Sequence, residues 1–300
     1  YYAPNIKREF ITGNRWLKEF YNHHRYDAIY MNTCTAARVK YCEYCVKKYK
    51  TPLIVHSHSG NAISAINIFS NKLYRNKITR VSKVHLACSE VAYRWMFSDK
   101  LNNDDIIPNG VDLDRFKYND TWRDEIRSQL GIEKNEVLIG NVGRFPPQKN
   151  QFYFIELAKR LEKKYKFLIV GDGELKKSIQ NKISEEKLDD RFRILPAKND
   201  IEKYYSAMDI FAMPSIFEGL PIVGIEAQAE GLICILSTNI SLQTGLSDRC
   251  SFIGIDNVGA WVDAITKCSL ERYNGSKLVK EKGFDSMRPV KMMEKIFDQI

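Results

Sequence analysis

The chain has 300 residues, of which 44% are hydrophobic, enough to bury the cores of two domains of ordinary size. Its 46 Lys and Arg residues against 37 Asp and Glu give a net charge of +9, which favours anionic partners such as nucleotide diphosphates, lipid headgroups or nucleic acid without choosing among them. Seven cysteines, an odd number in a chain of this length, exclude a small disulfide-stapled scaffold, and we expect a reducing, cytoplasmic compartment.

Helical and strand patterns alternate along the first third of the chain. Apolar and aromatic residues recur at helical spacing over residues 9–22, and residues 26–31 read as a buried strand. A second helix is predicted over residues 36–50, followed by a strand over residues 52–60 that ends in polar side chains. This alternation is typical of an α/β fold with a parallel sheet, in which ligands bind at the carboxyl ends of the strands.

His58 stands at the end of the second predicted strand, in the run Val55-His56-Ser57-His58. A histidine in this position is either a structural hydrogen-bond partner or a functional group, and the residues alone leave both interpretations open. His56 is expected to lie within the strand or to point to its other face.

Two cysteines in the second predicted helix, Cys42 and Cys45, have the spacing of half a zinc knuckle. The sequence contains no second pair of this kind and the flanking residues are helical, so we interpret them as two thiols of one helix.

Residues 62–83 combine apolar and basic side chains, which predicts either a helix that covers the sheet or a face that binds anionic lipid at a membrane surface. No membrane span is predicted. The longest apolar window, residues 219–237, contains Glu226 and Glu230 and divides better into loop, helix and strand.

A turn-rich junction over residues 106–112 precedes a second α/β region. Asp112 and Asp114 in this junction have the spacing with which some enzymes of another architecture bind a metal ion that in turn holds a diphosphate. The strand predicted over residues 136–143 then leads into a loop that carries Arg144 and Lys149. These two cations on a single loop are well suited to a diphosphate, because Arg can bond two oxygens at once while Lys acts as a point charge.

The strand predicted over residues 167–170 ends in a glycine turn at Gly171 and Gly173. The third glycine of a dinucleotide-binding fingerprint is absent, since Leu175 and Lys176 follow, and an NAD site is therefore rejected.

A strand over residues 209–215 is followed by Glu218, by Pro221 as a natural first residue of a helix, and by Glu226. A helix that opens at Gly219 directs free N–H groups and a positive dipole end at the loop, which suits a phosphate. Two carboxylates near a phosphate need other partners, and sugar hydroxyl groups are the obvious ones. This stretch predicts a nucleotide-sugar site.

These motifs together resemble the retaining GT-B glycosyltransferases of family 4. The resemblance rests on Pro-Ser-x-x-Glu-Gly-Leu-Pro-x-x-x-x-Glu-Ala over residues 214–227, Gly-Arg-x-x-x-x-Lys-Asn over residues 143–150, Pro108-Asn109-Gly110, and Val-His-Ser-His over residues 55–58. The last is the form seen in capsule and exopolysaccharide enzymes. The resemblance covers nearly all of the chain from about residue 26 and implies two Rossmann-like domains that face a cleft.

The resemblance also implies a role for each residue at a matching position. Glu218 would lie beside the donor sugar, Glu226 would bond the ribose diol, and His58 would approach the sugar from the other domain. Arg144 and Lys149 would bind the diphosphate.

Further donor contacts are implied at Gly219 and Leu220, and at Ala197 in the turn that meets the nucleobase. No metal is required in the family, so Asp112 and Asp114 are interpreted as part of the interdomain linker. The expected domains are residues 1–113 and 114–300, with an amphipathic helix over residues 286–300 that packs back toward the first domain.

The expected function is therefore the transfer of a sugar, with retention of configuration, from a UDP- or GDP-type donor to a glycan or lipid-linked acceptor. We expect this reaction to be a step in capsule or exopolysaccharide synthesis. An epimerase of the same architecture and a basic nucleic-acid-binding protein are the alternatives, although no interleaved basic and aromatic motif supports nucleic acid as a partner. The expected location is the cytoplasm, with peripheral contact at the anionic inner face of the membrane left open.

The first domain departs from the family pattern in one respect. The family's opening strand and glycine-rich loop have no counterpart before Tyr26, and the sequence has no initiator Met or leader. We therefore expect about two βα units to be missing, and we expect a chain that binds the donor but transfers the sugar poorly.

Overall fold

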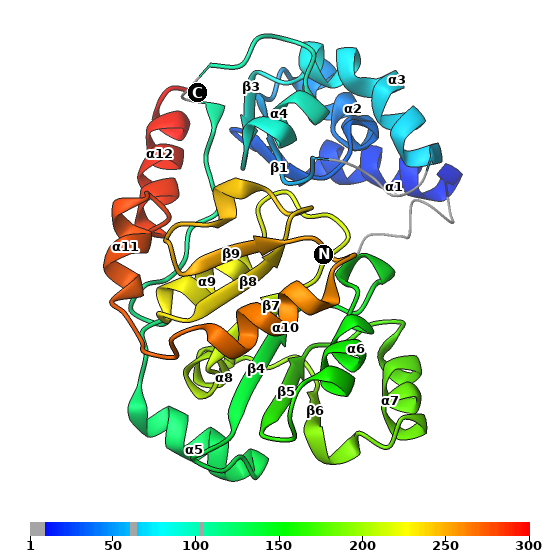
Figure 1. The fold of residues 1–300 in the computed structure, drawn as a ribbon. Helices are drawn as coiled ribbons and strands as arrows, with labels where there is room; N and C mark the ends of the chain where they lie inside the picture. The colour runs from blue at the N-terminus through cyan, green and yellow to red at the C-terminus, as the bar shows by residue number, and fades with distance from the viewer. Residues whose placement is uncertain (1–9, 61–64, 103–104) are drawn as a thin grey trace. The chain divides into compact units, whose positions relative to one another are not determined.

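The computed structural model describes residues 10–60, 65–102 and 105–300, and the chain divides into two compact units. Unit 1 comprises Tyr1–Pro108 and Pro289–Ile300, and unit 2 comprises Asn109–Arg288 (Figure 1). The boundary thus falls at Pro108, before the expected position after Leu113, and the C-terminal segment belongs to unit 1 rather than to the second domain.

Unit 1 contains a three-stranded parallel sheet in the order β1-β2-β3. Its elements are α1 Phe10–His23, β1 Ile29–Thr33, a 3-10 helix η1 Ala36–Tyr41, α2 Glu43–Tyr49, β2 Leu53–Ser57, α3 Ala65–Val81, β3 Val84–Ala87, α4 Glu90–Met96 and α12 Met287–Asp298. Met31 pairs with Val55 in the register of β1 and β2, and all five residues of β2 are buried, as expected for the central strand of a covered parallel sheet.

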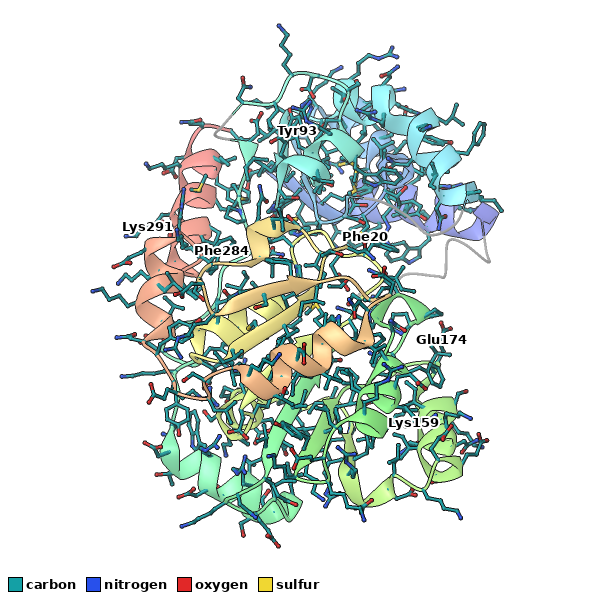
Figure 2. All side chains as sticks on the ribbon, in the orientation of Figure 1. Phe20, Tyr93, Lys159, Glu174, Phe284 and Lys291 are labelled. Carbon is teal, nitrogen blue, oxygen red and sulfur yellow. The ribbon has the colours of Figure 1, made fainter. Side chains whose placement is uncertain are left out.

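Helices pack on unit 1 around two apolar clusters. Tyr93 of α4 is fully buried in the larger cluster with Val55 and Ile78 (Figure 2). The smaller cluster joins the sheet to the C-terminal helix, and it contains Ile54, Leu86, Ile107, Met292, Met293, Ile296 and Ile300. The expected return of the C-terminal helix to the first domain is confirmed.

The helix predicted over residues 36–50 is in fact two helices joined at Cys42. The Cys42 N–H bonds to the carbonyl of Val39, three residues back, so the chain tightens into η1 before α2 restarts. Cys42 and Cys45 are buried thiols that contact the hydroxyl groups of Tyr21 and Thr51. Over the described ranges, no group of three or more His, Cys, Asp or Glu side chains is arranged to hold a metal ion.

Unit 2 contains a six-stranded parallel sheet in the order β6-β5-β4-β7-β8-β9. Its elements are α5 Asp120–Leu130, β4 Val137–Val142, η3 Pro147–Lys149, α6 Tyr153–Arg160, β5 Tyr165–Val170, α7 Lys176–Glu185, η4 Asp189–Arg191, β6 Phe192–Leu195, α8 Ile201–Ala207, β7 Ile210–Met213, α9 Ile222–Ala229, β8 Ile233–Ser237, η5 Leu242–Thr244, β9 Cys250–Ile253, α10 Val258–Lys267 and α11 Gly275–Glu281. Successive strands β4, β5 and β6 are added toward one edge of the sheet, and β7, β8 and β9 are added toward the other edge. The strand order therefore reverses between β4 and β7, as in a Rossmann-like sheet.

Alternate residues of the unit 2 strands enter two separate cores, as the two-residue period of a strand requires. Ile139 and Ile169 pack with α6, α7 and α10 on one face, whereas Leu138 and Leu168 pack with α5, α8, α9 and α11 on the other (Figure 1). The expected α/β class with parallel sheets is confirmed.

The apolar window over residues 219–237 divides into a loop, α9 and β8, as predicted. Among the described helices, none combines the length and the apolar character that crossing a bilayer requires.

A close backbone contact supports the loop after β4. Gly171 has a φ of +152°, and a Cβ atom built there would lie 1.9 Å from the carbonyl oxygen of Gly143. Gly173 approaches the backbone nitrogen of Phe145 in the same way, and the Phe145 N–H bonds to the carbonyl of Asp172. The two glycines of this turn let it stack against the loop that carries Arg144 and Lys149.

We predict that Gly171→Ala destabilises unit 2 by at least about 2 kcal/mol, because the methyl group meets backbone and φ stays in a region that favours glycine. Urea unfolding measures this effect. Gly219→Ala is the matched control, because nothing lies within 4 Å of a Cβ atom there. A Gly171 variant as stable as the Gly219 variant would contradict the close-packing argument.

Candidate functional site

The reversal of strand order in unit 2 brings together the two loops that carry the predicted donor residues. Lys149 follows β4 and Glu218 follows β7, and the Lys149 Nζ lies 2.8 Å from the Glu218 Oε1. Both side chains are largely buried, with 17% and 14% of their surface exposed. Ligands of such sheets bind at this switch point, beyond the carboxyl ends of the strands.

Hydrogen bonds join these two loops directly. The Ile216 N–H bonds to the Gln148 carbonyl at 2.8 Å, and the Gln148 side-chain amide donates to the Phe217 carbonyl at 2.8 Å. Asn150, in the left-handed conformation that Asn tolerates, donates its side-chain amide to the Pro214 carbonyl at 3.1 Å. The position of Glu218 relative to Lys149 is therefore set by backbone contacts as well as by charge.

Glu218 is also fixed by the loop that follows β8. Its N–H bonds to the Asn239 carbonyl, and its own carbonyl accepts from the Ser241 N–H, both at 3.2 Å. Its Oε1 is close enough to Lys149 for an ion pair, but the contact lacks the angles of a hydrogen bond, so this oxygen retains acceptor capacity.

The loop after Glu218 leads into α9. Gly219 is exposed and Leu220 is partly exposed, so both can contact a ligand outside the loop. Pro221 is the N-cap, and α9 begins at Ile222, one residue after the predicted start. No side chain caps this helix end, which leaves its first N–H groups directed at the loop.

Arg144 and Lys149 differ in their surroundings, although both were predicted to bind a diphosphate. Arg144 is exposed, and within the described residues its guanidinium has no acidic partner. Lys149 lies over Gly143, where a built Cβ atom would be 3.8 Å from the Lys149 Nζ. The Arg144 charge is available to an anion, whereas the Lys149 charge is shared with Glu218.

Glu226 lies in the second turn of α9, and a residue that the sequence did not indicate holds its side chain. The Tyr205 hydroxyl of α8 lies 2.9 Å from the Glu226 Oε2 and 3.2 Å from the Val223 carbonyl oxygen. Burial raises the pKa of Glu226, while the Tyr205 hydrogen bond and the charge of Arg115 oppose the rise. Among the described residues no protein group donates to the second carboxylate oxygen, which can therefore accept from a ligand.

Glu230, the C-cap of α9, follows Glu226 by one turn and is fully buried. The Ser206 hydroxyl donates to its Oε2 at 2.9 Å, and the nearby Arg272 guanidinium donates to its main-chain carbonyl at 2.8 Å. Burial raises the Glu230 pKa to about 7, against the effects of Ser206 and Arg272. A carboxyl group enclosed in this way is a structural neighbour of the site rather than a ligand-binding group.

The predicted base-binding position, Ala197, is exposed, and its N–H bonds to the Asp172 Oδ2 at 3.0 Å. Lys176 donates to the other oxygen of the same carboxylate at 2.7 Å, and these two bonds lower the Asp172 pKa. Asp172 thus ties the turn after β6 to the glycine turn after β5.

His58 belongs to unit 1 and lies just beyond the end of β2, as predicted, and His56 is buried within the strand. The His56 Nε2 is 3.1 Å from the Ile107 carbonyl, which only accepts, so this nitrogen carries the proton and Nδ1 accepts from the Tyr30 hydroxyl at 2.6 Å. Burial lowers the His56 pKa to about 4, which keeps the ring neutral.

The His58 Nε2 lies 2.8 Å from the Asn32 Oδ1 of β1, and burial lowers the His58 pKa. Donation from Nε2 to Asn32 leaves Nδ1 as an acceptor. A neutral imidazole with one fixed nitrogen and one open nitrogen is suited to bind a hydroxyl group.

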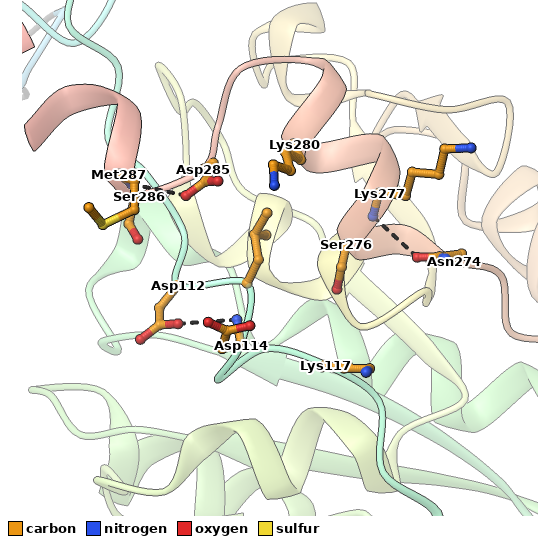
Figure 3. A pocket seen from close by; sticks show the side chains of 11 residues that line it. Asp112, Asp114, Lys117, Asn274, Ser276, Lys277, Lys280, Asp285, Ser286 and Met287 are labelled. Carbon is orange, nitrogen blue, oxygen red and sulfur yellow. Dashed lines mark hydrogen bonds between the residues drawn. The ribbon is translucent and has the colours of Figure 1, made fainter. Parts of the chain in front are cut away.

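Asp112 and Asp114 lie in a different place from the donor residues. They line a cavity of about 730 Å³ between residues 112–117 and 274–287, where Lys117 and Lys280 are also present (Figure 3). The Asp112 Oδ1 accepts the N–H groups of Asp114 and Arg115, which is the turn-forming role of an aspartate. Both residues belong to unit 2, so the interpretation of the segment as an interdomain linker is wrong at this position.

Sequence reasoning assigned no role to the residues that hold the site together, chiefly Gln148, Asn150 and Tyr205, although Asn150 is part of the motif over residues 143–150. A signal existed for Asn150, because an asparagine that ends a short helical turn commonly takes the left-handed conformation. No local signal exists for Tyr205, since its contact with Glu226 depends on how α8 packs beside α9.

Residues 123–267 match the family model described as Glycosyl transferases group 1. The chain is 31% identical over 266 residues to the UDP-Gal:alpha-D-GlcNAc-diphosphoundecaprenol alpha-1,3-galactosyltransferase of Escherichia coli, covering 82% of this chain and 68% of that protein. It is 25% identical over 258 residues to the O-antigen biosynthesis glycosyltransferase WclY of Escherichia coli, covering 75% and 72%. The crystal structure of Anabaena HepE in complex with UDP-glucose has a similar fold, with a TM-score of 0.80 at 19% identity over 95% of this chain and 82% of HepE.

We predict that Glu230→Gln stabilises unit 2 relative to the parent chain more at pH 8 than at pH 5. The folded-state pKa of about 7 lies above the ordinary value of 4.5, so the parent loses stability as the pH rises from about 4.5 through 7. The difference between these two pKa values limits the loss to roughly 3 kcal/mol. Urea unfolding at both pH values measures the difference.

Glu174→Gln is the control for this experiment, because Glu174 projects from the outside of unit 2 and its replacement removes the same charge from water (Figure 2). An identical stability difference at pH 5 and pH 8 for Glu230→Gln would show that Glu230 is ionised in the folded protein throughout.

Proposed function

The chain belongs to the Glycosyl transferases group 1 family and is a glycosyltransferase, and we propose that it transfers a hexose from a UDP-sugar to a lipid-linked or glycan acceptor with retention of configuration. The observation that carries the proposal is the ion pair of Lys149 with Glu218 at the switch point, on the loop that also carries Arg144, whose guanidinium has no acidic partner among the described residues. This arrangement offers cations for a diphosphate and a carboxylate for the sugar attached to it.

Arg144 and Lys149 would bind the diphosphate and stabilise the charge that grows on it as the glycosidic bond breaks. Preorganised cations act most strongly at the point where charge develops, which is the leaving phosphate oxygen. We propose that these two side chains and the N–H groups at the start of α9 supply this stabilisation without a metal ion.

Glu218 would lie beside the donor sugar and Glu226 would accept from the ribose hydroxyl groups. The open oxygen of Glu218 and its ion pair with Lys149 suit a carboxylate that faces both a sugar and a diphosphate. A mostly buried ion pair contributes little to stability in general, so a role in binding accounts better for its presence.

The remaining donor contacts would come from Gly219 and Leu220 beside the phosphate and from Ala197 at the base. UDP is the proposed nucleotide, because HepE was crystallised with UDP-glucose and the Escherichia coli galactosyltransferase is named for UDP-Gal. A GDP-sugar is the competing donor, and direct comparison of the two nucleotides distinguishes them.

His58 would contact the donor sugar through its open Nδ1. In the proposed front-face reaction the acceptor hydroxyl oxygen attacks the anomeric carbon as the bond from that carbon to the diphosphate breaks. An oxygen of the leaving diphosphate takes the proton of the acceptor hydroxyl group. Glu218 is engaged with Lys149 rather than free to act as a nucleophile, which supports this route over a covalent intermediate.

The proposed pathway is the assembly of a surface polysaccharide, in a cytoplasmic setting. It is supported by the names of two relatives, one for O-antigen biosynthesis and one for an acceptor linked through diphosphate to undecaprenol. The proposal fails if the chain transfers no hexose from any UDP- or GDP-sugar to lipid-linked saccharides while it remains folded.

We predict that Arg144→Ala weakens UDP binding by about 1.5–3 kcal/mol, the range for a charge-assisted hydrogen bond. Lys149→Ala should cost more, because it also leaves the Glu218 carboxylate unpaired beside the diphosphate. Titration calorimetry at constant salt measures both effects. Unchanged affinity in both variants would remove the diphosphate assignment.

Glu218→Gln separates binding from transfer within the same loop pair. It releases Lys149 for the diphosphate, so UDP should bind as well as before or more tightly, while turnover of a UDP-hexose should fall about 100-fold. Adding Glu218→Gln to Lys149→Ala should restore part of the lost UDP affinity. A double variant no better than Lys149→Ala alone would show that the two side chains act independently.

We predict that Glu226→Gln weakens UDP but leaves a 2′,3′-dideoxy analogue almost unaffected, because a lost diol acceptor has no effect where no diol exists. Tyr205→Phe should act in the same direction and more weakly, since it frees the Glu226 carboxylate without removing it. Equal weakening of both ligands would assign Glu226 to the structure of α9 rather than to ribose.

A further inference from the structure

The net positive charge of the protein lies entirely in unit 1. Unit 1 contains 19 Lys and Arg residues against 10 Asp and Glu, whereas unit 2 contains 27 of each, so the net charge of +9 belongs to unit 1 alone. The proposed nucleotide site lies in unit 2 and does not account for this excess. Unit 1 therefore has an electrostatic preference for an anionic partner of its own.

Helix α3 in unit 1 exposes a stripe of large apolar side chains. Ile66 is 79% exposed, Phe69 is 69% exposed and Leu73 is 65% exposed. Steps of three, four and seven residues place these side chains on one face of the helix, while Asn71 and Ile78 are buried on the inner side. Exposed apolar groups in a row are unusual on a soluble surface and indicate a binding face.

A basic cavity lies at the C-terminal end of the same helix. It has a volume of about 500 Å³, its lining includes Lys47, Lys50, Arg80 and Lys83, and it contains no acidic residue. Among the described residues, Lys47 forms an ion pair with Glu43, and no ion pair involves the other three cations. Arg80 follows Leu73 by seven residues, so the apolar stripe and the cavity share one side of α3.

We propose that unit 1 docks on an anionic phospholipid bilayer, with Ile66, Phe69 and Leu73 in the interfacial region and a lipid phosphate in the basic cavity. Helix α3 is 17 residues long and would lie along the surface, where apolar burial and charge attraction add together. Free phosphate or nucleic acid would use the cavity but not the stripe. A second copy of the chain would use the stripe but would bring two basic units together.

The test is sedimentation of the full chain with vesicles of phosphatidylglycerol mixed with phosphatidylcholine, and with vesicles of phosphatidylcholine alone. We expect binding to the anionic vesicles that falls with added salt, and at least about ten-fold weaker binding to the neutral ones. Replacement of Ile66, Phe69 and Leu73 by Ser should weaken anionic vesicle binding about ten-fold or more. Arg80→Glu with Lys83→Glu should have a similar effect and remove much of the salt dependence.

Matched controls come from unit 2, which has no net charge. Leu242→Ser removes an apolar side chain that is 71% exposed, and Lys177→Glu reverses an exposed charge, and neither should alter vesicle binding. All altered residues are exposed, and a UDP titration with a thermal melt checks that each variant folds.

Several outcomes would overturn the proposal. One is binding to neutral vesicles that is as strong as binding to anionic vesicles. Another is vesicle binding that the stripe and cavity variants leave unchanged. A third is that the chain binds inorganic phosphate or an oligonucleotide but no vesicles. A stripe variant that changes only the oligomeric state would assign the stripe to a second copy instead. The assay contains no donor or acceptor, so its failure is distinguishable from a failure of the proposed transfer reaction.

Discussion

The hydrogen bonds between the loops after β4 and β7 are the constraint on which the candidate donor site depends. Because β4 and β7 are neighbours at the point where the strand order reverses, the loops that follow them start side by side and lead to helices on opposite faces of the sheet. Gln148 and Asn150 join the two loops by hydrogen bonds, with Lys149 and Glu218 in contact between them. The glycine turn after β5 packs against the loop after β4, through the contacts of Gly171 with Gly143 and of Gly173 with Phe145. Backbone contacts therefore position the loops that carry the charged side chains.

Glu226 within α9 and Glu230 at its C-cap show how a single helix can present one carboxylate and enclose another. Glu226 and Glu230 lie four residues apart and therefore on one face, and burial raises the pKa of both. Glu226 has one oxygen engaged by Tyr205, whereas Glu230 is fully buried against Ser206 and Arg272. The difference arises from position along the helix, because Glu226 is nearer the open loop and Glu230 is nearer the core.

Much of the fold could be predicted because parallel strands and their helices have strong local patterns. The α/β class, the end of β2 at His58 and the loop positions of Arg144 and Glu218 all followed from strand and turn signals. The helix predicted over residues 36–50 was wrong at Cys42, since a tightened turn leaves no mark in an otherwise helical pattern. The domain boundary was placed late because residues 108–114 are all turn-like, and only the contacts of Val111 with Phe284 and Ser286 show which unit holds them. The ion pair of Lys149 with Glu218 and the Tyr205 contact could not be predicted, because they depend on strand order and helix packing.

The net positive charge lies in unit 1 and not in unit 2, and the different anions proposed for the two units explain this difference. A nucleotide site needs its cations at one loop, and a surface of uniform positive charge around it would bind diphosphates without discrimination. Unit 2 has as many acids as bases, so Arg144 and Lys149 act as local charges in a neutral surrounding. Attraction to an extended anionic surface requires the opposite arrangement, in which many charges act together over a distance of several ångströms. Unit 1, with its charge excess and its exposed apolar stripe on α3, has this arrangement, so the two proposed kinds of anion recognition would be kept on separate parts of one chain.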